Sequence, residues 1–195
     1  MTMPASAPID TAAVRALSDQ PLDWSFKGVP ARWWGRTPAQ IVAQRRELFA
    51  AGVSGPVCVL RADALTHNIE TMAGWCGDRG MQLAPHGKTH MSPQLAARQL
   101  AAGACGITVA TVGQAAVYRA FGVRNLVLAN ELVDDAGLRW VAAELDRDPG
   151  LGFVCWVDSV RCRCNGTCSG LRGGSRSGRR TPARPGAGTS TAETR

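Results

Sequence analysis

This chain of 195 residues contains two lysines against twenty arginines, and one lysine lies among reactive side chains. Lys88 belongs to the octet A-P-H-G-K-T-H-M at residues 84–91, which places an amine, two imidazoles and a hydroxyl within five positions. A lysine amine that is partly desolvated near other cationic groups becomes a nucleophile towards aldehydes. The octet therefore points to Schiff-base chemistry at Lys88. The alternative is a solvated loop lysine whose neighbouring histidines make turn hydrogen bonds.

Short apolar runs alternate with helical patterns along the chain and would position this octet. The expected strands cover residues 57–60, 81–84, 106–110, 126–129 and 153–157, and the expected helices cover residues 38–51, 63–78, 93–102, 113–121 and 134–147. Strands that alternate with helices in this way form βαβ units and a parallel sheet. Lys88 follows the strand expected at 81–84, and the carboxyl ends of strands are where α/β proteins build their sites.

The predicted fold class is α/β, with two parallel architectures in competition. One is a doubly wound open sheet, which is weakened because no G-x-G-x-x-G fingerprint follows a strand. The other is a TIM-type (β/α)₈ barrel, which needs about 250 residues when complete. We therefore expect a partial barrel with about half of its strands at residues 55–160, after an N-terminal arm at residues 1–54.

The last part of the chain differs in composition from the rest. Residues 161–195 hold eight of the 22 basic residues and a single acid, so they account for the whole net charge of +7. They also hold seven glycines and one large apolar side chain, Leu171, which predicts a disordered tail. Because the change is abrupt and directly follows an apolar run, we interpret the tail as the product of a reading-frame change. A natural disordered tail is the alternative.

Several classes of function are disfavoured by composition. The basic tail could neutralise phosphates, but it lacks Lys, Phe, Tyr and Trp, which argues against nucleic-acid binding. Its three cysteines have neither a fourth ligand nor paired spacing, so no metal site is predicted. No signal peptide or long apolar segment is present, which favours a cytoplasmic protein without membrane contact. The remaining cysteines lie in apolar or helical patterns typical of buried free thiols: Cys58, Cys76, Cys105 and Cys155.

Three segments carry a resemblance to a known family. L-A-P-H-G-K-T-H-M at 83–91, Q-L-A-A-G-A-C-G-I-T-V-A-T at 99–111 and L-A-N-E-L at 128–132 resemble the D-threonine aldolase and D-serine dehydratase-like family. The resemblance is greatest to the branch often labelled amino acid deaminase. These are fold-type III pyridoxal-phosphate enzymes that share the alanine-racemase N-terminal barrel. The resemblance covers roughly residues 15–160, which implies a C-terminally truncated member.

The resemblance implies a role for the residues of the octet. Lys88 matches the lysine that forms the internal aldimine with pyridoxal 5'-phosphate, and it is the predicted catalytic residue. His86 and Thr89 match the residues that flank this lysine and either line the edge of the cofactor or orient the amine. Many aldolase-branch members have Arg where Ala84 stands and Lys where Met91 stands, which argues against a simple aldolase.

Three further residues are predicted to line the cofactor pocket. Thr111 matches a pocket hydroxyl, and Asn130 and Asp158 follow the next two strands, where pocket groups are expected. Helix capping is the alternative for each of the three, because Thr, Asn and Asp are residues that begin helices.

The function implied for the full-length parent is the deamination of a small D-β-hydroxy amino acid of the D-serine or D-threonine type. Aldol cleavage and racemisation remain alternatives, since the phosphate-binding loops and the second catalytic group of the family lie beyond the resemblance. The resemblance is compatible with a homodimer for the full-length parent, and a non-catalytic pyridoxal-phosphate-binding protein is a further alternative. For this chain alone we expect weak or absent cofactor binding and no turnover.

Overall fold

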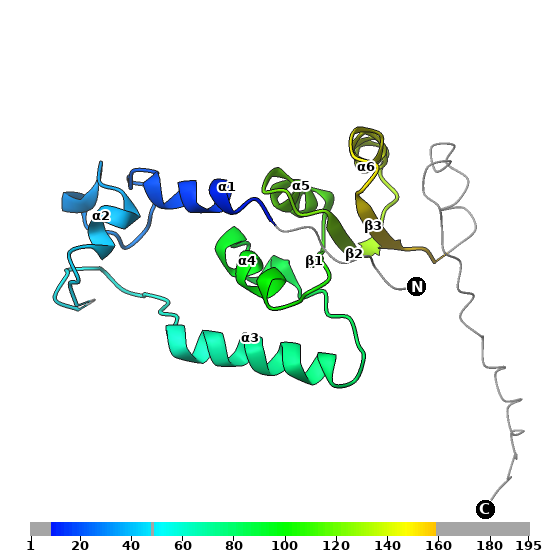
Figure 1. Cartoon of the computed structure of the whole chain (residues 1–195). Helices are drawn as coiled ribbons and strands as arrows, with labels where there is room; N and C mark the ends of the chain where they lie inside the picture. Colours follow the sequence, from blue (N-terminus) through cyan, green and yellow to red (C-terminus); the bar gives the residue numbers. More distant parts are fainter. Residues whose placement is uncertain (1–8, 48, 159–195) are drawn as a thin grey trace, which may run out of the picture.

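A small parallel sheet forms the centre of the protein. The computed structural model describes residues 9–47 and 49–158 (Figure 1). The strands are β1 (Ile107–Val109), β2 (Asn125–Glu131) and β3 (Gly152–Trp156), in the order β1-β2-β3. Helix α5 (Val112–Ala120) connects β1 to β2, and helix α6 (Asp135–Arg147) connects β2 to β3. All pairings are parallel, so the predicted α/β fold with a partial parallel sheet is confirmed.

The segment that leads to Lys88 runs beside β1 without forming a regular strand. The backbone N–H of Cys105 donates to the carbonyl oxygen of Leu83 over 2.8 Å, and the N–H of Thr108 donates to that of Pro85 over 2.8 Å. His86 pairs with Thr108 in an isolated parallel bridge. The strand predicted at 81–84 is thus present as an extended segment that is tied to the sheet at a few points.

The helices of the second half begin at polar side chains, as the sequence predicts. Helix α4 (Pro93–Ala101) follows Ser92, whose hydroxyl accepts from the N–H of Leu95 over 3.3 Å. Helix α6 follows Asp134, whose carboxylate accepts from the N–H of Gly137 over 2.6 Å. Such caps satisfy N–H groups that have no partner within the helix, which explains why the helices predicted at 93–102, 113–121 and 134–147 are each found within one residue.

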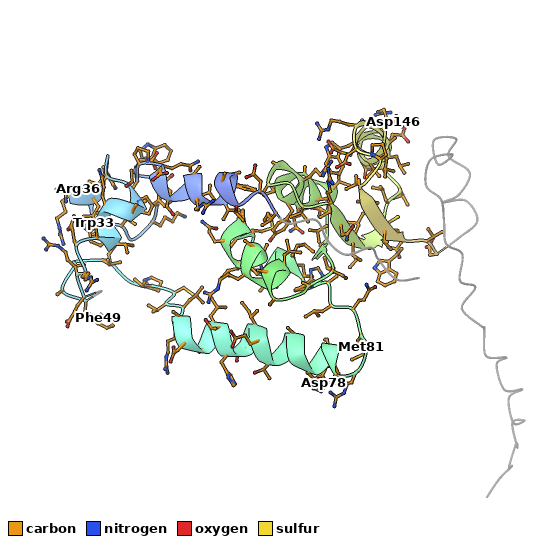
Figure 2. The ribbon with its side chains drawn as sticks, in the orientation of Figure 1. Trp33, Arg36, Phe49, Asp78, Met81 and Asp146 are labelled. Carbon is orange, nitrogen blue, oxygen red and sulfur yellow. The ribbon has the colours of Figure 1, made fainter. Side chains whose placement is uncertain are left out.

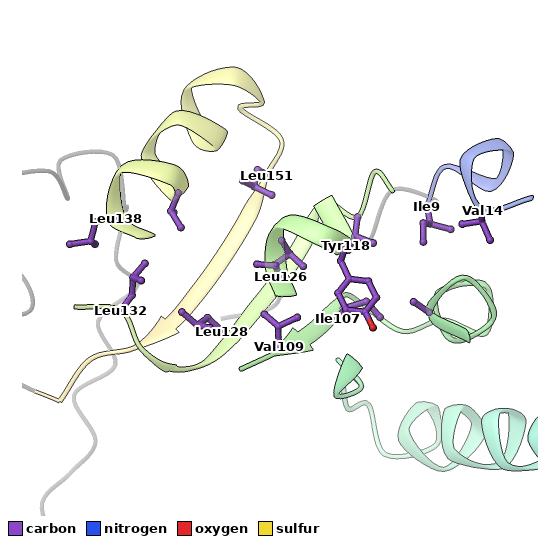
Figure 3. Close-up of a cluster of buried hydrophobic side chains, with 14 residues drawn as sticks. Ile9, Val14, Ile107, Val109, Tyr118, Leu126, Leu128, Leu132, Leu138 and Leu151 are labelled. Carbon is purple, nitrogen blue, oxygen red and sulfur yellow. The ribbon is translucent and has the colours of Figure 1, made fainter. Parts of the chain in front are cut away.

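The hydrophobic core lies between the sheet and the helices that connect its strands (Figure 3). Ile107, Val109 and Leu126 of the sheet are fully buried. Helix α1 (Thr11–Ala16) also reaches this core, because Val14 and the preceding Ile9 are buried in it. The first residues described are therefore part of the core, although the sequence predicts an arm outside it.

The rest of the N-terminal region has less regular structure than predicted. The helix expected at 38–51 is limited to α2 (Pro38–Val42), and the backbone of Arg45 has a left-handed φ of 48°. Helix α2 begins with a capping box between Thr37 and Gln40, but Val42 at its end is 74 % exposed. A short helix with little apolar surface to bury gains too little from packing to extend further. Figure 2 shows this region, with Trp33, Arg36 and Phe49 labelled, at a distance from the sheet.

The predicted strand at 57–60 is wrong for the described structure. Residues 57–60 are exposed and carry no strand assignment. A strand needs a hydrogen-bonded neighbour, and no described segment pairs with this one. For the same reason the prediction of a buried thiol fails at Cys58, which is exposed, whereas Cys76 and Cys105 are buried and Cys155 is half-buried.

Helix α3 (Ala62–Gly77) forms as predicted for residues 63–78 but packs loosely. It runs beneath α4 in Figure 1, and an apolar cavity of about 550 Å³ separates the two, lined by residues that include Ile69, Met72 and Leu83. Met72 and Trp75 remain 50 % and 48 % exposed. None of the predicted site residues lines this cavity.

One prediction concerns residues that the structure does not describe. The tail at residues 161–195, with its predicted disorder, lies outside the described residues. Within the described part of the chain, no helix is long and apolar enough to cross a membrane, and no group of three or more potential metal ligands is found.

Candidate active site

Lys88 lies in the middle of a short 3₁₀ turn, η3 (Gly87–Thr89), at the carboxyl-end edge of the sheet. The turn follows His86, whose pairing with Thr108 aligns it with β1. The side chains of His86, Lys88 and Thr89 are exposed, and Gly87 between them is buried. The octet therefore presents the amine, an imidazole and a hydroxyl to the outside while its glycine packs inward.

Thr108 holds the backbone just before this turn. Its hydroxyl donates to the carbonyl oxygen of Ala84 over 2.6 Å, and the side chain is buried. The close approach of β1 to β2 is set by Gly106, where an added Cβ would lie 2.6 Å from the carbonyl oxygen of Asn125. The amide of Asn125 in turn donates to the carbonyl oxygen of Cys105 over 2.7 Å. These contacts connect the Lys88 segment to the centre of the sheet.

The backbone of His90 and Met91 closes the turn on its other side. Nδ1 of His90 accepts from the N–H of Ser92 over 3.0 Å. Burial lowers the pKa of His90, and the side chain of Gln99 opposes this shift in part. Nε2 of His90 and Oε1 of Gln99 are nevertheless buried without a hydrogen bond of normal geometry to any described residue. Burial and the acceptor role of Nδ1 both favour the neutral imidazole of His90 inside the turn.

Thr111 caps helix α5. Its hydroxyl accepts from the N–H of Gln114 over 3.2 Å, and the side chain of Gln114 accepts from the N–H of Ala110 over 2.9 Å. The capping alternative is therefore confirmed for Thr111. A hydroxyl that accepts one hydrogen bond can still donate one, so the cap leaves the predicted pocket role open.

Asn130 lies in an irregular part of β2. Leu128 pairs with Cys155 and Glu131 with Trp156, so the register shifts around Asn130. The Asn130 side chain accepts from the N–H of Glu131 over 3.0 Å, and α6 is capped by Asp134 instead. Asn130 therefore does not cap the next helix. Bulges in strands often redirect side chains beside active sites.

Parallel pairing brings the predicted site residues to one edge of the sheet. Thr111 follows β1, Asn130 is near the end of β2, and Asp158 follows β3 by two residues. All three side chains are exposed. Helix capping by Asp158 would involve residues outside the described part of the chain. Their roles in binding a cofactor stay predictions.

One buried residue at this site is absent from the sequence-based prediction. The hydroxyl of Tyr118, on α5, donates to the carbonyl oxygen of Gly87 over 2.8 Å, and the side chain is fully buried. The signal in the sequence is weak, because a tyrosine in a helical pattern usually indicates core packing. It is, however, the single tyrosine of the chain.

Comparison with known proteins identifies relatives by sequence. No family model matches the chain. D-threonine aldolase from Arthrobacter sp. is 36 % identical over 88 residues, which are 45 % of this chain and 23 % of that protein. D-threo-3-hydroxyaspartate dehydratase from Delftia sp. (strain HT23) is 29 % identical over 124 residues, which are 53 % of this chain and 33 % of that protein. The chain thus spans a quarter to a third of the length of these relatives.

Solved structures agree with the sequence comparison. The crystal structure of D-threonine aldolase from Filomicrobium marinum matches 57 % of this chain with a TM-score of 0.53 and 33 % identity, and 29 % of that protein is covered. A variant of D-threo-3-hydroxyaspartate dehydratase matches 64 % of this chain with a TM-score of 0.53 and 30 % identity, and 31 % of that protein is covered. Over about half of its length the chain is therefore homologous to D-threonine aldolase and D-threo-3-hydroxyaspartate dehydratase, the fold-type III pyridoxal-phosphate enzymes that the residues around Lys88 resemble.

Proposed function

We propose that this chain carries the lysine-bearing part of a pyridoxal-phosphate-dependent lyase that acts on small D-configured β-hydroxy amino acids. The observation that carries the proposal is the position of Lys88. Its side chain is exposed in a turn at the carboxyl-end edge of a parallel sheet, in a chain that is homologous over about half of its length to two enzymes named for D-amino acids.

The exposed side chains along this edge fit the functional groups of the cofactor. Lys88 supplies a primary amine for the aldehyde, and His86 and Thr89 flank it with an imidazole and a hydroxyl. Thr111 and Asn130 add hydrogen-bonding groups from the neighbouring strands for polar atoms of the cofactor or the substrate. Bound pyridoxal phosphate supplies an electron sink for the charge that develops when a bond to the substrate α-carbon breaks.

The names of the relatives favour two of the three reactions considered. Both name a D-amino acid that carries a hydroxyl on its β-carbon, one as the substrate of an aldolase and the other as that of a dehydratase. We place loss of the β-hydroxyl with release of ammonia first, aldol cleavage second and racemisation third. In each case the residues of this chain would bind and orient the substrate, and groups beyond it would select the bond that breaks.

For the chain itself we propose weak cofactor binding and no turnover. Phosphate dianions bind to open helix N-termini, but the N-termini of α4, α5 and α6 are already capped by Ser92, Thr111 and Asp134. The carboxylate of Asp134 would also repel a phosphate. Each charge-assisted hydrogen bond that is missing costs about 1.5–3 kcal/mol, so several missing contacts raise the dissociation constant by several powers of ten.

Covalent trapping tests the assignment of Lys88. The chain is incubated with pyridoxal 5'-phosphate and reduced with borohydride, and the labelled lysine is located by peptide mass spectrometry. Because Lys27 is the other lysine of the chain, Lys27→Ala is a matched control for Lys88→Ala. We expect Lys88 to be labelled in the wild type and in Lys27→Ala, and the unreduced cofactor to be lost on desalting. Labelling of Lys27 alone contradicts the assignment of Lys88. Colour that is retained through desalting contradicts the proposal of weak cofactor binding.

Substrate assays test the reaction class. D-serine and D-threonine are added to the chain with excess cofactor, and ammonia and glycine are measured. We expect neither product from this chain. In a longer protein obtained by restoring another reading frame after residue 160, ammonia indicates deamination and glycine indicates aldol cleavage. A non-catalytic cofactor-binding protein would release neither.

A further inference from the structure

Tyr118 and Gly87 form a close contact between helix α5 and the turn that carries Lys88. The Tyr118 hydroxyl donates to the carbonyl oxygen of Gly87 over 2.8 Å across 31 residues of sequence. The Tyr118 side chain is fully buried within the hydrophobic core (Figure 3). Burial raises its pKa, so the hydroxyl stays protonated and able to donate at neutral pH.

Gly87 is required at this position by the proximity of the ring. A Cβ added to Gly87 would lie 2.6 Å from the Tyr118 hydroxyl oxygen and 2.7 Å from two ring carbons. Gly87 is not among the glycines with a left-handed φ, so its backbone conformation is open to other residues. The absence of a side chain is therefore explained by packing against Tyr118 and not by backbone geometry.

The carbonyl oxygen of Gly87 also organises the turn. It accepts from the backbone N–H groups of His90 and Met91. Met91 adopts a left-handed φ of 44°, which a methionine rarely adopts, and its side chain packs against the core. Strained backbone of this kind persists where surrounding contacts over-determine it. Lys88 thus lies between a carbonyl that is held by Tyr118 and a backbone segment that is held by packing.

We propose that Tyr118 is a positioning residue for Lys88. Its hydroxyl and ring hold the Gly87 carbonyl, and through it the turn, so that the Lys88 amine projects from the edge of the sheet. The inference rests on the proposed function, because it assigns Tyr118 a role in presenting the amine to the cofactor aldehyde. Because the Tyr118 side chain is fully buried, its effect on the amine is transmitted through the turn.

Tyr118→Phe removes the hydroxyl and keeps the ring. The reaction measured is the condensation of the Lys88 amine with the aldehyde of pyridoxal 5'-phosphate, in which a C=N bond forms, water leaves, and borohydride then reduces the product to a stable secondary amine. Loss of one hydrogen bond to a buried carbonyl predicts a rate of Lys88 labelling that is lower by about two- to tenfold. Val117→Ala is the matched control, since Val117 is the preceding residue of α5 and is 41 % exposed. In the Val117→Ala variant, Lys88 should be labelled at the wild-type rate.

A double-mutant cycle tests the ring contact. Gly87→Ala alone is expected to slow labelling and to lower the urea midpoint, because the new methyl group overlaps the Tyr118 ring. In a Tyr118→Leu background the same substitution should reduce the labelling rate and the urea midpoint by less, because the shorter side chain leaves room for the methyl group. If Gly87→Ala is too unstable to purify, recovery of folded protein in the double variant supports the contact. The ring contact is overturned if Gly87→Ala lowers the labelling rate and the urea midpoint equally in both backgrounds, or if no folded protein is recovered from the double variant.

The single tyrosine allows a readout that a purely structural role would not move. In protein labelled with 3-fluorotyrosine, one ¹⁹F resonance reports Tyr118. We expect it to shift when Lys88 is labelled and to stay unchanged when Lys88→Ala is treated in the same way. An unchanged resonance in fully labelled wild type overturns the inference.

The outcomes separate the inference from the function on which it rests. No labelling of Lys88 in the wild type overturns the proposed function, and the inference with it. Labelling of Lys88 that proceeds at the same rate in folded Tyr118→Phe overturns the inference alone.

Discussion

Nε of Arg119 on α5 lies 2.8 Å from Oε2 of Glu144 on α6, and the two side chains are only 10 % and 9 % exposed. The same guanidinium contacts Asp148 over 2.7 Å, and Arg147 also donates to Glu144. Burial alone would raise the pKa of Glu144, but the hydrogen bonds from Arg119 and Arg147 outweigh burial and lower it. This network joins the helices that connect the three strands.

Removing the charge of Glu144 should therefore destabilise the fold. Glu144→Gln leaves Arg119 buried with a weaker partner, and we expect a loss of about 1.5–3 kcal/mol in the free energy of unfolding, measured by urea denaturation. Asp63→Asn is the control, because the Arg61–Asp63 pair is mostly exposed and such pairs contribute little. Equal urea midpoints for the two variants would show that the buried network does not stabilise the fold.

Substitution by alanine should change the stability of the protein in opposite directions at Gly106 and at Gly74. At Gly106 a Cβ would lie 2.6 Å from the carbonyl oxygen of Asn125, whereas at Gly74, inside α3, nothing lies within 4 Å. Gly106→Ala should destabilise the protein by about 1–3 kcal/mol through overpacking. Gly74→Ala should stabilise it by about 0.5–1 kcal/mol through helix propensity. Thermal unfolding of both variants measures the difference, and a stabilising Gly106→Ala is the result that would contradict the packing of β1 on β2.

His90 should make the stability depend on pH below neutrality. Because burial lowers its pKa in the folded state, the unfolded chain takes up the proton first, near the ordinary pKa of about 6.5. The contribution of neutral His90 to the free energy of unfolding is complete above that pH. It decreases as the pH falls through the pKa of His90 in the folded state. Urea midpoints measured from pH 7.5 to 5.5 should decline, and they should decline less in His90→Gln. In His67→Gln, which alters an exposed histidine of α3, the wild-type slope should persist.

The outer edge of β3 should promote self-association. Strand β3 is the last in the sheet order, and among the described strands nothing pairs with its outer edge. Val154 and Trp156 on it are 36 % and 57 % exposed. Unpaired edges with apolar side chains favour association, and a lysine disfavours it. Sedimentation velocity should show oligomers of the wild type and fewer in Val154→Lys. Val42→Lys, on α2, should resemble the wild type, and a monomeric wild type would refute the prediction.

Features that depend on neighbouring residues could be predicted from the sequence. The helices at 93–102, 113–121 and 134–147 begin where Ser92, Thr111 and Asp134 supply a cap, and a cap acts within three residues. The runs at 106–110 and 126–129 are apolar and form the largely buried strands β1 and β2, whereas the apolar run at 153–157 forms the more exposed edge strand β3. Lys88 could be singled out because lysine is rare in this chain and the octet around it is dense in polar groups.

Features that depend on distant partners could not be predicted in this way. The run at 57–60 has the composition of a strand but finds no partner among the described segments, and the helix expected at 38–51 lacks a surface on which to pack. The contact between Tyr118 and Gly87 joins residues that are 31 positions apart. The sequence by itself determined the local elements, the reactive octet and the family that it resembles. Only the tertiary structure decided that Gly87 must lack a side chain and that Tyr118 contacts the lysine turn, because both depend on how closely α5 approaches that turn.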